Sequence, residues 1–71
     1  MSKETHTSRG VLVRLEVSDD VVVIRYGNLL LFKTITSSEK NNIERMVDSF
    51  GVEDTVNNIF RTSSRMVGTV A

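Results

Sequence analysis

The residues VVVIRYGNLLLFKTI (21–35) contain the clearest structural signal in the sequence. Two apolar, β-branched runs, Val21–Tyr26 and Leu29–Ile35, flank the dipeptide Gly27-Asn28. Glycine adopts a positive φ without strain, and this dipeptide is one of those that close a two-residue turn between antiparallel strands. The pattern therefore predicts a β-hairpin over residues 21–35.

The turn also fixes which side chains of the hairpin share a face of the sheet, because successive residues of a strand point to opposite sides. On one face, the predicted pairs are Tyr26 with Leu29, Ile24 with Leu31 and Val22 with Lys33. On the other face, they are Val23 with Phe32 and Val21 with Thr34. Both faces of the predicted hairpin are then largely apolar.

One more strand is expected before the hairpin. Val11, Val13, Leu15 and Val17 alternate with Leu12, Arg14 and Glu16, which is the period of a strand. The residues 18–20 (SDD) then predict a turn. The first nine residues, MSKETHTSR, are polar and show no period, so we expect a flexible tail over 1–9 and one domain over 10–71.

A helix is expected directly after the hairpin. Thr36 and Glu39 have the spacing of a capping box, in which the hydroxyl accepts from the third helical N–H and the carboxylate returns to the cap. Apolar residues follow at helical spacing up to Phe50, and Gly51 suits a terminator with positive φ. The pattern predicts a helix over Ser37–Phe50.

A second helix is expected after Gly51, with Glu53 or Asp54 as its N-cap and Gly68 at its end. Its predicted apolar stripe comprises Val56, Ile59, Phe60, Ser63, Met66 and Val67. A competing interpretation makes Val56–Phe60 a fourth strand, although the two asparagines inside this segment disfavour the extended form.

Together these elements predict an α+β fold, a three-stranded antiparallel meander followed by an αα-hairpin (β-β-β-α-α). Two helices cover only one face of such a sheet, and a second copy related by two-fold symmetry is the simplest cover for the other. We therefore expect a homodimer that forms through the sheet. Its predicted interface residues are Val21, Val23, Leu30 and Phe32.

The composition argues against catalysis and against bound cofactors. The chain has no cysteine and a single histidine, His6, which falls in the expected tail, so one subunit cannot assemble a Ser-His or Cys-His arrangement. Its glycines stand alone, which disfavours a phosphate-binding loop, and no metal site or small-molecule substrate is evident. The longest apolar runs, among them Val21–Ile24, are too short to cross a membrane. We expect a non-enzymatic, cytoplasmic protein, of a cell or of something that infects one.

A candidate binding face lies on the second predicted helix. The chain has nine basic and nine acidic residues, so no overall charge indicates nucleic acid, but residues 55–71 contain arginines and no acid. Asn57, Asn58, Arg61 and Arg65 would form a face of amide and guanidinium groups, which contact phosphates and base edges in DNA complexes. Arg9 in the tail would add a phosphate contact. Ordinary solvated helix surface is the alternative interpretation of this face.

Three partial resemblances bear on function. The stretch LEVSDDVVVIRYGNLLLFK (15–33) resembles the latter half of swapped-hairpin regulators of the AbrB type, which are DNA-binding dimers. The stretch GVEDTVNNI (51–59) is similar to the last strand of BON domains, which attach proteins to membranes and to each other. The order strand, helix, glycine turn, helix resembles the ribbon-helix-helix repressors. Each resemblance covers part of the chain, and two of them imply DNA.

The leading hypothesis is therefore a small, homodimeric, nucleic-acid-binding module similar to a transcriptional regulator. The alternative is a protein-interaction module or inhibitor that docks a partner through the exposed sheet face or an edge strand.

Overall fold

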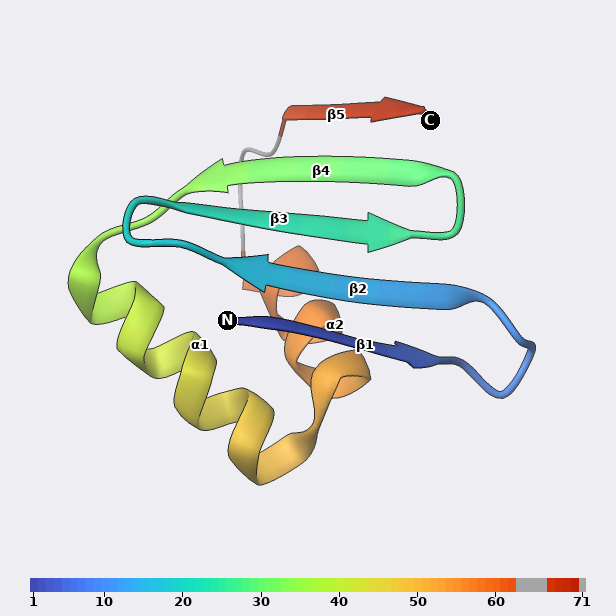
Figure 1. Ribbon diagram of the computed structural model, residues 1–71, viewed down its shortest axis with the longest axis horizontal. Coiled ribbons are helices and arrows are strands. Elements are labelled where there is room, and N and C mark those ends of the chain that lie inside the picture. The colour runs from blue at the N-terminus through green and yellow to red at the C-terminus, as the bar shows by residue number, and fades with distance from the viewer. Residues whose placement is uncertain (63–66, 71) are drawn as a thin grey trace.

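An antiparallel sheet forms one layer of the molecule, and two helices form the other (Figure 1). The computed structural model describes residues 1–62 and 67–70. Its elements, in chain order, are β1 (Ser2–His6), β2 (Leu12–Val17), β3 (Val21–Tyr26), β4 (Leu29–Thr34), α1 (Ser37–Phe50), α2 (Val52–Thr62) and β5 (Val67–Val70). The strands lie in the order β1-β2-β3-β4-β5. The predicted α+β class, with an antiparallel sheet followed by two helices, is confirmed.

The central hairpin has the predicted register. Tyr26 pairs with Leu29, and Val23 pairs with Phe32. Gly27 has a φ of +61°, and no non-glycine residue among those described has a positive φ. A positive φ at the first turn residue alone is the geometry of a type II′ turn, whose twist matches that of the flanking strands. Glycine is therefore needed at position 27, and Asn28 only completes the turn.

The core lies between the sheet and the helices. Leu15 and Ile24, neighbours in β2 and β3, are both fully buried, and each such side chain contributes roughly 1.5–3 kcal/mol by leaving water. The ring of Tyr26 meets that of Phe60 from α2 edge-on, with centroids 6.1 Å apart. The other buried apolar residues are Val13, Val17, Val22, Ile35, Ile43, Val47, Val56 and Ile59.

The two helices meet at Gly51 without an intervening loop. The predicted capping box is present at the start of α1, and Gly51 at its end has a φ of +88° and donates its N–H to the carbonyl of Val47. The carbonyl of Gly51 accepts from both the N–H and the hydroxyl of Thr55, so the same glycine begins α2. The expectation that Glu53 or Asp54 caps α2 is therefore wrong, because both lie inside its first turn.

The N-terminal residues correct the prediction of a flexible tail over 1–9. Ser2–His6 form β1, which pairs with β2 along its whole length. The connecting turn is closed by the hydroxyl of Thr7, which accepts from the N–H groups of Arg9 and Val11. An edge strand exposed on both sides needs few apolar residues, and this explains why its sequence shows no strand period.

The C-terminal residues correct the predicted end of the second helix. α2 ends at Thr62, and Val67–Val70 form β5, which pairs with β4. Gly68 therefore lies within a strand and does not end a helix. Residues 63–66 of the predicted helical stripe lie outside the described residues. The competing strand over Val56–Phe60 is excluded, because this segment is helical. The predicted three-stranded meander is thus widened by a strand on each side.

Candidate functional site

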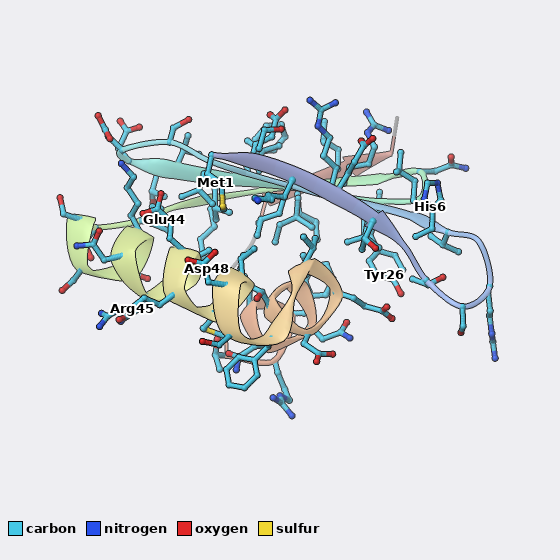
Figure 2. The ribbon with its side chains drawn as sticks, turned by 60° about the horizontal axis from the view of Figure 1, so that its bottom comes forward. Met1, His6, Tyr26, Glu44, Arg45 and Asp48 are labelled. Carbon is cyan, nitrogen blue, oxygen red and sulfur yellow. The ribbon has the colours of Figure 1, made fainter. Side chains whose placement is uncertain are left out.

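Both described helices, α1 and α2, lie on the same face of the sheet, and the other face carries neither of them. Figure 2 shows α1 and α2 on the same side of the sheet, with side chains projecting from the opposite side. We call this second side the open sheet face. Its members follow from the strand registers, since directly paired residues point to the same side. The face presents an apolar part over β3 and β4 and a charged part over β1 to β3.

The apolar part contains the residues predicted as a dimer interface. Val21, Val23, Leu30 and Phe32 all belong to the open sheet face, as the register requires. The three aliphatic side chains are partly exposed, and Phe32 is 38% exposed, which is high for a phenylalanine in a strand. The structure thus brings these four residues together, while their contact with a partner stays a prediction.

The charged part consists of residues that the sequence reasoning did not single out. Arg14 and Glu16 of β2 form an ion pair of 3.0 Å, and both side chains are nearly half exposed. Arg25 of β3 is the direct neighbour of Arg14 and lies on the same face. A shallow hollow lined by Arg14, Glu16, Val23, Arg25 and Leu30 joins the charged part to the apolar part. The two-residue period and the hairpin register contained the signal for this grouping.

The predicted nucleic-acid residues are not brought together. Asn57 and Arg61 are exposed on α2, whereas Asn58 is half-buried in a cleft between the two helices. Arg9 lies in the turn between β1 and β2, and Arg65 lies outside the described residues.

Charge on the exposed side of α2 also differs from the expectation. Asp54 is exposed and stands three residues before Asn57 and seven before Arg61, so it shares their helical stripe. The described part of this face therefore carries one acid and one base. The prediction considered the charges from residue 55 onward, whereas α2 begins at Val52, and its first turn adds Asp54 to this face.

Outside the open sheet face, the described residues form ion pairs but no larger cluster of histidine and acidic side chains. His6 lies at one end of the molecule, far from Glu44 and Asp48 of α1 (Figure 2). Over residues 1–62 and 67–70, no group of three or more histidine or acidic residues is placed to hold a metal ion. Neither of the described helices has the length and apolar character needed to span a bilayer.

The ion pairs outside the open sheet face attach α1 to the sheet. The backbone N–H of Thr36 and the ammonium of Lys33, 3.2 Å from the carboxylate, lower the pKa of Glu39. The ammonium of Lys40 lies 2.8 Å from Asp19, lowers the pKa of that carboxyl and has its own pKa raised. These pairs join β4 and the turn between β2 and β3 to the first turns of α1. Their role is structural.

Comparison with known proteins gives no assignment: no family model matches the chain, and no curated protein or solved structure matches it. The function must therefore be argued from the chemistry of its own surfaces.

Proposed function

We propose that this chain is a non-enzymatic protein-interaction module and that the open sheet face is its binding surface. The observation that carries the proposal is the partly exposed apolar cluster of Val21, Val23, Leu30 and Phe32 on a face that neither α1 nor α2 covers. Contiguous apolar surface of this kind marks interaction sites. A domain of 71 residues also gains more from added buried area than a larger one, because its own core is small.

The charges of the open sheet face favour a protein over nucleic acid. Arg14 is neutralised by Glu16, and Glu4 points to the same side of the neighbouring strand. The face therefore carries two arginines and two glutamates from β1 to β3. Phosphate binding is favoured by an excess of positive charge, and single-stranded nucleic acid also needs several aromatic rings for stacking. Phe32 is the single aromatic residue on the face in the described strands β1–β4.

A nucleic-acid-binding regulator is the second candidate. The exposed guanidinium of Arg61 and the exposed amide of Asn57, one turn apart on α2, favour it. Asp54 on the same stripe opposes it, since its carboxylate repels phosphate.

Site-specific photo-crosslinking can separate these candidates. A photoreactive amino acid is placed at Phe32 in one variant and at Asn57 in another, and each chain is irradiated in an extract of the cells that produce it. We expect a protein adduct at position 32 that excess wild-type chain suppresses, whereas excess Val23→Glu chain does not. Nucleic-acid adducts at position 57, with none at position 32, would instead support the regulator.

A further inference from the structure

We infer that the open sheet face binds a second copy of this chain, related by a two-fold axis that runs across the strands. This inference rests on the proposed function and names the partner of the same surface. Its starting point is the arrangement of the face in two rows. The acidic row contains Glu16, Val23 and Phe32, which are direct neighbours on β2, β3 and β4. The arginine row, next along the strands, contains Glu4, Arg14, Arg25 and Leu30, so its net charge is positive, whereas that of the acidic row is negative.

The two rows are complementary to each other. They lie two residues apart along the strands, or about 7 Å. A two-fold axis halfway between them places the acidic row of one copy over the arginine row of the other. On β2, Glu16 then faces Arg14 of the second copy, and on β4, Phe32 faces Leu30 of the second copy. On β3, Val23 faces Arg25 of the second copy, and each contact occurs twice. One operation therefore pairs opposite charges on β2 and apolar side chains on β4.

An unpaired charge supports the same arrangement. Arg14 and Arg25 are direct cross-strand neighbours on one face, and like charges in this position repel. Within residues 1–62, Arg14 has Glu16 as an ion-pair partner, but Arg25 has no acidic side chain within ion-pair distance. In the proposed dimer, Glu16 of the second copy lies over Arg14 and beside Arg25. The dimer thus brings an acidic side chain beside Arg25, which has none at ion-pair distance within residues 1–62 of its own copy.

Replacing the Arg14–Glu16 ion pair within each copy by pairs between the copies costs little free energy. The Arg14–Glu16 pair is 48% and 43% exposed, and exposed pairs contribute at most about 1 kcal/mol. The charged part also lies to one side of the apolar part, so it can remain at the rim of the interface, where the desolvation of ions is incomplete.

The size of the face predicts a weak dimer. Strands spaced about 4.8 Å apart and five or six residues long give a face of roughly 20 by 20 Å. Two such faces bury roughly 800 Å², which is below the range of stable complexes. We expect a dissociation constant in the micromolar range, so that the dimer forms and dissociates with concentration.

Charge reversal tests the pairing directly. In Arg14→Glu, two glutamates of one copy meet two of the other, and in Glu16→Arg four arginines meet. Each variant alone should dimerise at least about tenfold more weakly than wild type in analytical ultracentrifugation. An equimolar mixture of the two should form a heterodimer with near wild-type affinity. The double variant R14E/E16R should dimerise like wild type, because it exchanges the rows' charges. Arg45→Glu, on the exposed side of α1, is the matched control and should not change dimerisation.

The outcomes separate this inference from the proposed function. Unchanged self-association in both single variants, or no heterodimer in the mixture of folded chains, would overturn the two-fold arrangement. A wild-type chain that stays monomeric up to millimolar concentration, yet crosslinks to another protein at position 32, would overturn self-pairing and leave the proposed function standing. A monomer without any protein adduct at position 32 would overturn both.

Discussion

A leucine-to-alanine substitution should affect the stability of the fold very differently on the two faces of the sheet. Leu15 and Leu30 are both leucines of central strands, but Leu15 is fully buried against the helices and Leu30 lies partly exposed on the open sheet face. Leu15→Ala removes buried methyl groups and leaves a cavity, so it should lower the free energy of unfolding by about 3 kcal/mol, within the usual 2–5 kcal/mol. The total free energy of unfolding of a domain of this length is roughly 4–10 kcal/mol. Leu30→Ala should cost less than about 1 kcal/mol in the monomer.

Urea unfolding followed by circular dichroism at 222 nm measures both effects. At protein concentrations well below the dissociation constant, only Leu15→Ala should shift the midpoint strongly. At high concentration, the wild-type chain and Leu15→Ala should gain stability through the dimer, whereas Leu30→Ala should gain less. Equal costs for the two variants at low concentration would refute the assignment of the buried and open faces. A concentration dependence unaffected by Leu30→Ala would remove this residue from the interface.

Four further substitutions test the turn and the helix start. Thr36→Ala should lower the free energy of unfolding by about 1 kcal/mol, as measured by urea titration, because the third N–H of α1 loses its acceptor. The pKa of Glu39 is lowered by the Thr36 N–H and, to a smaller extent, by Lys33. Its carboxylate therefore stabilises the fold at pH values above the usual glutamate pKa near 4.3. This stabilisation is lost as the pH falls through the lower pKa of the folded state. In thermal unfolding between pH 7 and 3, the melting temperature of Glu39→Gln should therefore fall less steeply with decreasing pH than that of the wild type. Parallel curves for the two proteins would contradict this. Gly27→Ala should destabilise the hairpin by about 1 kcal/mol or more because of its positive φ, whereas Asn28→Ala should cost less in the same urea assay.

The parts of the fold that could be predicted from sequence are those with local signals. A glycine with positive φ fixes the central hairpin, and the capping box with Gly51 fixes both ends of α1. Once the hairpin register is known, the two faces of β3 and β4 follow, and so does the grouping of Val23, Leu30 and Phe32.

The remaining parts depend on pairing between segments whose own sequences are weak indicators. Ser2–His6 is polar because both sides of an edge strand reach solvent, and its strand character comes from hydrogen bonds to β2. The strand Val67–Val70 has only four residues, and both helices separate it in the sequence from its partner β4. The charged part of the open sheet face was missed for a related reason. Charged residues in an alternating strand look like ordinary solvent-facing positions until the register places Arg14 beside Arg25.

The order of the strands also bears on how the chain folds. From β1 to β4, each strand pairs with its neighbour in sequence, and closing short loops costs little conformational entropy. Such hairpins form within microseconds, whereas β5 can join only after the chain has passed through both helices. Until then, the edge of β4 presents unpaired N–H and C=O groups to solvent. During that interval, we expect β5 of one chain to compete for the β4 edge of another, which makes strand exchange the characteristic misfolding route of this topology.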